Sequence, residues 1–169
     1  DNLLTGGGDF PRAGTRLLPA LLFADDAVLM GRTPRALQSL INRFDAYMRN
    51  LDMKINISKT FTMSCSTRPH PRPIHFTLNG TRIANTENFT YLGIIYNRKG
   101  SWSQNVINKT GVMCRELLAL STFSSKIGHR SLKHLLSIYK ARSVPIATYG
   151  AGVWGGTDVR AIQIAENKV

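Results

Sequence analysis

Two adjacent carboxylates, Asp25 and Asp26, lie between apolar runs at 17–23 and 27–31. Such runs predict two short, largely buried strands with the acidic pair at the bend between them. At the edge of a low-dielectric core an uncompensated carboxylate costs several kcal/mol, and neighbouring carboxylates also repel each other. Mg²⁺ removes both costs, since it prefers oxygen ligands and is often held by one or two carboxylates together with substrate phosphates. The alternative is a solvated turn in which aspartate simply suits the backbone.

The segment after the acidic pair predicts a helix packed on a sheet. Thr33 is typical of a helix N-cap, and Pro34 suits the first helical position. Apolar residues then recur at helical spacing as far as Leu51. Residues 61–65 resemble a short strand, and the Asn-Gly pair within 74–84 predicts a hairpin with a type I′ turn.

The pattern changes near residue 100. Residues 89–96 predict one further strand, whereas apolar residues recur at helical spacing after 101 and again over 132–139. A strand-rich part with one helix, followed by a helical part, indicates an α+β fold. We therefore expect an irregular glycine-rich lead-in at 1–16, a strand-rich part at 17–100 and a helical segment at 101–169.

The chain has 22 Lys and Arg residues against 10 Asp and Glu residues, which gives a net charge of +12 and a pI near 10.3. This balance predicts a polyanionic partner, nucleic acid first and an anionic membrane surface second. Between 98 and 142 the one acidic residue is Glu116. We therefore expect a basic face that contacts a nucleic-acid backbone, and the alternative is an ordinary solvated surface. The candidate contact residues are Lys109, Arg115, Lys126, Arg130, Lys133 and Lys140.

Cellular context follows from what the sequence lacks. No apolar stretch reaches the roughly 18 residues that a membrane span needs. The chain starts at Asp1 without a methionine or a leader, so we expect a piece of a longer polypeptide that is not secreted. Cys65 and Cys114 lack a partner motif, which favours reduced, buried thiols in an intracellular compartment.

Three motifs occur in one order along the chain: Phe-Ala-Asp-Asp at 23–26, Asn56-x-x-Lys59-Thr60, and Tyr91-Leu92-Gly93. With this order the chain resembles the reverse transcriptases (RNA-directed DNA polymerases) of non-LTR, LINE-like retrotransposons. The segments are similar to motifs C, D and E of those enzymes, motif E being the primer grip, and the helical tail resembles their thumb. The resemblance covers nearly everything from Leu17 to Trp154. It implies a partial palm of antiparallel strands with one packed helix, followed by a helical thumb.

The resemblance assigns catalytic roles. Asp25 binds the catalytic Mg²⁺ ions, and Asp26 supports that charge without always coordinating. Lys59 lies near the triphosphate as a candidate proton donor to the leaving pyrophosphate, and Asn56 shapes its loop. From the residues alone, Lys59 is better described as a surface lysine after a strand.

The resemblance also implies contacts with the primer strand. Phe23 and Ala24 lie beneath the primer end, and Tyr91, Leu92 and Gly93 hold the primer backbone, where glycine permits close approach. The alternative for these last three residues is a plain core strand. The implied partners are an RNA template paired with a DNA primer, and a dNTP.

The metal site is incomplete by this comparison. In two-metal phosphoryl transfer, bound metal ions stabilise both the attacking and the leaving oxygen. The resembled family holds these ions with a further Asp from motif A, upstream of motif C. Few residues precede Asp25, and Asp9 lies in a glycine-rich loop, which is the wrong context for that ligand. We therefore expect weak or absent Mg²⁺ binding, and no polymerisation without the upstream fingers and palm half of the same polyprotein.

These observations leave three hypotheses for function. The first is the C-terminal palm and thumb portion of a polymerase that performs Mg-dependent, RNA-templated DNA synthesis in the intact protein. That protein works inside the cell, in the cytoplasm or nucleus, as a retroelement ribonucleoprotein with no membrane partner. The second is a non-catalytic nucleic-acid-binding remnant of a transposable element. The third is a degenerate product, or a fragment used in protein–protein contact.

Overall fold

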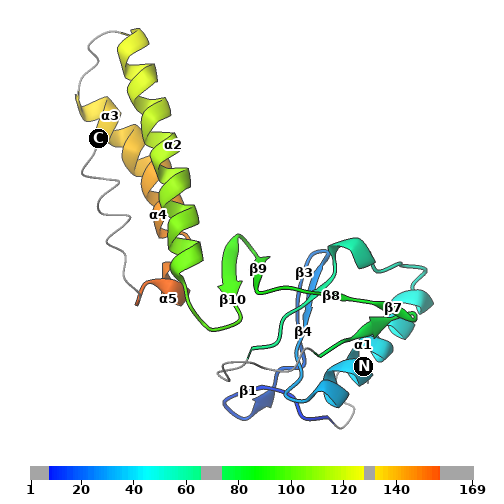
Figure 1. Ribbon diagram of the computed structural model, residues 1–169. Helices are drawn as coiled ribbons and strands as arrows, with labels where there is room; N and C mark the ends of the chain where they lie inside the picture. The colour runs from blue at the N-terminus through cyan, green and yellow to red at the C-terminus, as the bar shows by residue number, and fades with distance from the viewer. Residues whose placement is uncertain (1–7, 66–73, 128–131, 157–169) are drawn as a thin grey trace. The chain divides into compact units, whose positions relative to one another are not determined.

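The computed structural model describes residues 8–65, 74–127 and 132–156. The chain divides into two compact units, one formed by residues 1–64 and 68–86 and the other by residues 65–67 and 87–169. We call them the strand unit and the helical unit, and describe each by itself (Figure 1).

The strand unit contains small sheets and one long helix, α1 (Pro34–Asn50). Three of its sheets are antiparallel hairpins, β1–β2, β3–β4 and β6–β7, and in the fourth β5 and β8 run parallel. The lead-in at 1–16 was expected to be irregular, yet its described part contains β1 and begins β2. The remaining bounds are β1 (Arg12–Ala13), β2 (Arg16–Leu17), β3 (Ala20–Phe23), β4 (Asp26–Leu29), η1 (Ile57–Lys59), β5 (Phe61–Thr62), β6 (Thr77–Leu78), β7 (Thr81–Arg82) and β8 (Ala84–Asn85).

Helix α1 begins where the sequence predicts. The Thr33 side chain accepts a hydrogen bond from the backbone N–H of Ala36 at 3.2 Å, and Pro34 occupies the first turn, where it loses no helical hydrogen bond. The apolar face of the helix is buried in two clusters, one around Leu40 and the other around Ile41. The second cluster joins α1 to the β6–β7 region through Phe76, Leu78 and Ile83.

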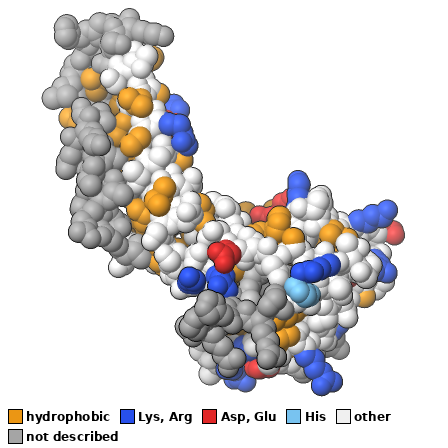
Figure 2. Space-filling view, in the orientation of Figure 1, with side chains coloured by type: hydrophobic (Ala, Val, Ile, Leu, Met, Phe, Trp, Pro, Cys, Tyr) orange, Lys and Arg blue, Asp and Glu red, His pale blue; other side chains and the backbone are white. Residues whose placement is uncertain are grey.

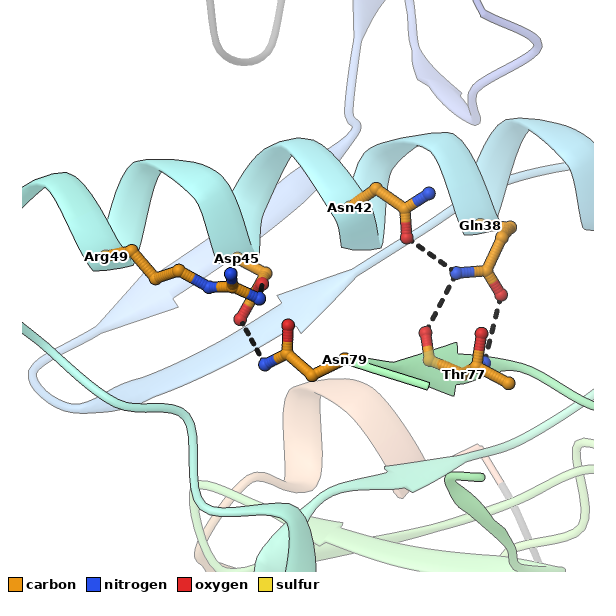
Figure 3. Close-up of polar contacts among 6 residues, drawn as sticks. All are labelled: Gln38, Asn42, Asp45, Arg49, Thr77 and Asn79. Atoms are coloured by element: carbon orange, nitrogen blue, oxygen red, sulfur yellow. Dashed lines mark hydrogen bonds and ion pairs between the residues drawn. The ribbon is translucent and has the colours of Figure 1, made fainter. Parts of the chain in front are cut away.

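The predicted hairpin over 74–84 is confirmed. Its turn residues, Asn79 and Gly80, have φ values of 51° and 75°, the left-handed conformation that a type I′ turn requires. Figure 3 shows that the polar face of α1 also binds this hairpin. Gln38 exchanges two hydrogen bonds with the backbone of Thr77, at 2.9 and 3.0 Å, and Asp45 accepts one from Asn79 at 3.1 Å. The hairpin is therefore fixed to α1 by directional contacts as well as by apolar packing.

The helical unit begins with a hairpin and continues as helices. Residues 89–96 were predicted to form one strand, and this prediction is wrong, because the chain reverses at Leu92–Gly93 (φ 49° and 72°) and pairs with itself. The bounds are β9 (Asn88–Tyr91), β10 (Ile94–Asn97), α2 (Ser103–Ile127), α3 (Leu132–Ile138), the π-helix η2 (Tyr139–Ser143), α4 (Val144–Thr148) and α5 (Ala151–Trp154).

The β9–β10 hairpin packs with the helices that follow it. Ile94 of β10 is buried against Val106 of α2 and Trp154 of α5. Further along α2, Met113 and Leu117 form a second cluster with Ala147. The compact units therefore divide at 86/87, whereas the sequence pattern placed a boundary near 100. Among the described residues, no helix is both long and apolar enough to span a membrane.

Candidate functional site

The acidic pair lies at the tip of the β3–β4 hairpin. Phe23 pairs with Asp26 across the ladder, so Ala24 and Asp25 form a two-residue turn between the strands. Ala24 has a φ of 51°, a conformation that costs a residue with a Cβ about 1–2 kcal/mol. The predicted position of the carboxylates at a bend is confirmed.

The predicted burial of this hairpin is wrong. Leu29, at the base of β4, packs against the clusters on α1, but the residues toward the tip extend beyond that contact. Leu22 and Phe23 are 61% and 59% exposed, and both aspartates are exposed. The carboxylates therefore carry little of the desolvation cost that the sequence argument assigned to them.

The donor set still fits a hard cation in part. Asp25 and Asp26 are consecutive residues at the hairpin tip, and neither takes part in the ion pairs found among the described residues. Mg²⁺ is commonly bound by one or two carboxylates, with water and phosphate oxygens filling its other positions. In the described part of the chain, no group of three or more His, Cys, Asp or Glu side chains comes together.

The loop that carries Lys59 is organised by Asn56. The Asn56 side chain caps the turn η1 by accepting hydrogen bonds from the Ser58 backbone N–H at 3.1 Å and the Ser58 hydroxyl at 2.7 Å. The Asn56 carbonyl accepts a third hydrogen bond from the Thr60 hydroxyl at 2.7 Å. Lys59 ends this turn with an exposed side chain, and none of the described hydrogen bonds or ion pairs joins it to the acidic hairpin. Its part in proton transfer stays a prediction.

The Leu92–Gly93 turn is held by side chains of the helical unit. The Tyr149 hydroxyl donates to the Leu92 carbonyl at 2.9 Å, and Lys109 Nζ donates to the Gly93 carbonyl at 3.3 Å. Lys109 Nζ also lies 4.7 Å from the centroid of the Tyr149 ring, within the range of a cation–π contact. One turn earlier on α2, the Asn105 side chain accepts from the Ile95 backbone N–H at 3.1 Å.

This cluster corrects one predicted contact residue. Lys109 is only 8% exposed, and burial lowers its pKa below the usual lysine value. The prediction that Lys109 belongs to an exposed basic face is therefore wrong. Sequence reasoning missed Asn105 altogether, since one polar residue within an amphipathic helix gives no signal of the strand it binds.

The other predicted basic residues differ in environment. Arg115, Lys133 and Lys140 are exposed, and the last two border a hollow of about 480 Å³ with Leu136 and Ser137. Arg130 and the side chain of Lys126 lie outside the described residues.

Not every cation of this segment is available to a partner. Arg142 is paired with Glu116, whose hydrogen bond and charge raise the pKa of the arginine. Exposed apolar side chains, among them Ile107 and Leu118, lie on the same unit, and Figure 2 shows apolar and basic side chains near one another there. The exposed cations are therefore interspersed with apolar groups.

The sequence is similar to a known polymerase. It is 25% identical over 139 residues to the RNA-directed DNA polymerase from mobile element jockey of Drosophila melanogaster, an alignment that covers 79% of this chain and 15% of the fly protein. The chain therefore spans a small part of that relative. No family model matches the chain, and no solved structure matches it. The similarity supports a relationship to the polymerases of mobile elements.

Proposed function

We propose that the chain supplies the part of a non-LTR retrotransposon reverse transcriptase that runs from the catalytic carboxylates through the thumb. The observation that carries the proposal is the β3–β4 turn, which presents Asp25 and Asp26 together and exposed at the tip of a hairpin. The similarity to the fly mobile-element polymerase supports the class of reaction. In this proposal the strand unit is a partial palm, and the helical unit carries the primer-holding hairpin and the thumb.

The reaction of the whole protein is the transfer of a nucleotide from a dNTP to the 3′-hydroxyl of a DNA primer on an RNA template. Mg²⁺, when bound, stabilises the charge on the transferred phosphoryl group. Asp25 and Asp26 would hold the ion through their carboxylate oxygens, and Lys59 would give a proton to the leaving pyrophosphate. Two carboxylates make up part of a two-metal site, so the reaction requires ligands beyond these two.

The helical unit would contact the sugar-phosphate backbone of the RNA/DNA duplex. The Leu92–Gly93 turn is exposed, and a glycine at this point lets a sugar-phosphate backbone approach closely. Arg115, Lys133 and Lys140 are exposed, and their positive charges would attract the phosphates of the duplex.

A second candidate function is nucleic-acid binding without catalysis. It is favoured by the net charge of +12 together with the exposed cations of the helical unit. This function makes no use of the acidic turn, so it predicts binding that is unchanged by Asp25→Asn.

A primer-extension assay separates the two functions. The chain would be tested on an RNA/DNA primer–template duplex, alone and together with the upstream part of its reading frame supplied in trans. We expect no incorporation by the chain alone, and Mg²⁺-dependent incorporation by the combination that Asp25→Asn abolishes.

Asp52→Asn is the matched control, because Asp52 is an exposed carboxylate of the strand unit at a φ of 56° that asparagine tolerates. Equal incorporation by the Asp25→Asn and Asp52→Asn variants would contradict the polymerase proposal. Duplex binding without incorporation in any combination would favour the second candidate. Incorporation by the chain alone would overturn the argument that its metal site is incomplete.

A further inference from the structure

Two consecutive backbone carbonyls at the tip of the β9–β10 hairpin each accept a hydrogen bond from a distant side chain. Tyr149, 57 residues further along the chain, binds the Leu92 carbonyl at 2.9 Å, and Lys109 binds the Gly93 carbonyl at 3.3 Å. The lysine ammonium also lies 4.7 Å from the centroid of the Tyr149 ring, so the two side chains support each other.

The turn itself has little local reason to form. Two-residue hairpin turns with positive φ at both positions favour Asn-Gly or Gly-Gly, whereas this one carries Leu at a φ of 49°. A left-handed leucine is strained, and such strain persists where surrounding contacts determine the conformation. Leu92 is also exposed, so packing in a core does not explain the turn.

Contacts within the helical unit also restrict Lys109 and the backbone of Tyr149. Lys109 is 8% exposed, and a buried ammonium is costly unless hydrogen bonds or charges compensate it. The Tyr149 carbonyl accepts a hydrogen bond from Trp154 Nε1 at 3.0 Å. Gly150 then takes a φ of 73°, and a Cβ added there would lie 2.5 Å from Ile94 Cδ1. These contacts fix the backbone of Tyr149 next to the hairpin, while its ring is half exposed.

We propose that Lys109 and Tyr149 are positioning residues that hold the Leu92–Gly93 turn in the orientation in which it contacts a nucleic-acid backbone. The inference rests on the proposed function, since it concerns the same hairpin. Lys109 then differs in role from the exposed lysines. Its ammonium donates to a carbonyl of the protein, whereas the exposed lysines would bind phosphates of the duplex.

The salt dependence of binding separates the two tasks. Each lysine that contacts a phosphate contributes about one to the slope of log affinity against log salt concentration. A positioning residue lowers the affinity without changing that slope. The experiment measures binding of the full chain to an RNA/DNA primer–template duplex by fluorescence anisotropy over a series of salt concentrations. The variants are Lys109→Met, Tyr149→Phe, the double variant and Lys140→Met.

We expect Tyr149→Phe to weaken binding by about three- to tenfold, the factor that corresponds to one neutral hydrogen bond. Lys109→Met should weaken it by about tenfold or more, because a hydrogen bond from an ammonium is stronger, and both variants should keep the wild-type slope. The double variant should lose less than the product of the two factors, since both side chains act on one turn. Lys140→Met, at an exposed lysine, is the control for a phosphate contact and should lower the slope by about one. Leu117→Val, in the separate cluster with Met113, controls for a general loss of stability and should leave the affinity unchanged.

Several results would overturn the proposal. If Lys109→Met lowers the slope by about one, the lysine contacts a phosphate directly. If both single variants bind like the wild type, the turn does not depend on them. Tyr149→Phe removes only a hydroxyl and decides the matter alone if Lys109→Met does not fold. Failure of the wild-type chain to bind the duplex would instead refute the proposed function, and this inference with it.

Discussion

Substituting Gly150 by alanine tests the packing that joins the helices to the β9–β10 hairpin. Three glycines of the helical unit have nearly the same φ, 74° at Gly100, 72° at Gly93 and 73° at Gly150. An added Cβ meets nothing within 4 Å at Gly100, lies 3.3 Å from Tyr149 Cε1 at Gly93, and lies 2.5 Å from Ile94 Cδ1 at Gly150. The series therefore keeps the backbone cost constant and varies the crowding.

The magnitudes follow from these distances. A left-handed alanine costs about 1–2 kcal/mol at any of the three positions. At Gly150 the new methyl also displaces the end of the Ile94 side chain, which is buried against Val106 and Trp154. Overpacking of this kind costs about 1–3 kcal/mol more. We expect Gly150→Ala to reduce the unfolding free energy by about 2–5 kcal/mol, Gly100→Ala by about 1–2 kcal/mol, and Gly93→Ala by an intermediate amount, because the exposed Tyr149 ring is able to shift.

Urea unfolding followed by tryptophan fluorescence measures the unfolding free energy of the helical unit, in which all three glycines lie. The two tryptophans of the chain, Trp102 and Trp154, both belong to the helical unit, so their signal reports its unfolding even if the strand unit unfolds separately. Far-UV circular dichroism checks that each variant is folded at the start. If Gly150→Ala reduces the unfolding free energy no more than Gly100→Ala does, the Ile94 side chain moves aside without cost, and the inferred close packing is wrong.

Three further predictions concern single contacts. Thr33→Ala removes the N-cap of α1 and should lower the unfolding free energy of the strand unit by about 1 kcal/mol in a thermal melt, and Thr33→Ser should restore it. Gln38→Ala removes both hydrogen bonds to the Thr77 backbone and should cost about 1–3 kcal/mol, with faster hydrogen exchange at the Thr77 amide; unchanged exchange would contradict the pairing. Burial lowers the pKa of Lys109 in the folded state, so the unfolded state binds more protons between that pKa and 10.5, and stability relative to Lys109→Met should rise with pH in this window. A flat difference across it in urea titrations would refute the burial of the ammonium.

The sequence predicted the elements whose causes are local. The cap at Thr33 and the apolar spacing after it define α1, because a helix depends on residues three or four positions apart. The Asn79–Gly80 turn was equally predictable, since both residues tolerate a positive φ.

The sequence predictions that were wrong share one physical cause, which is that the deciding contacts join segments far apart in the chain. Leu92 gives no local signal of a turn, and the side chain that holds its carbonyl, Tyr149, lies 57 positions away. The count of basic residues likewise placed Lys109 on an open surface, although the hairpin covers it. Apolar runs around the acidic pair are typical of buried strands, but periodicity does not reveal what covers a strand.

The two turns that the proposed function uses differ in what fixes them. Leu92–Gly93 is strained and is held by side chains of its own unit, so its role can be tested by duplex binding alone. Ala24–Asp25 also includes a residue with positive φ, but the described contacts that hold it are those of the β3–β4 ladder, and the apolar residues beside it are exposed. A site of that kind gains its electrostatic strength when water is excluded around it. The carboxylates should therefore be judged by nucleotide incorporation with the upstream polypeptide present, because Mg²⁺ affinity measured on the chain alone samples them in high-dielectric surroundings.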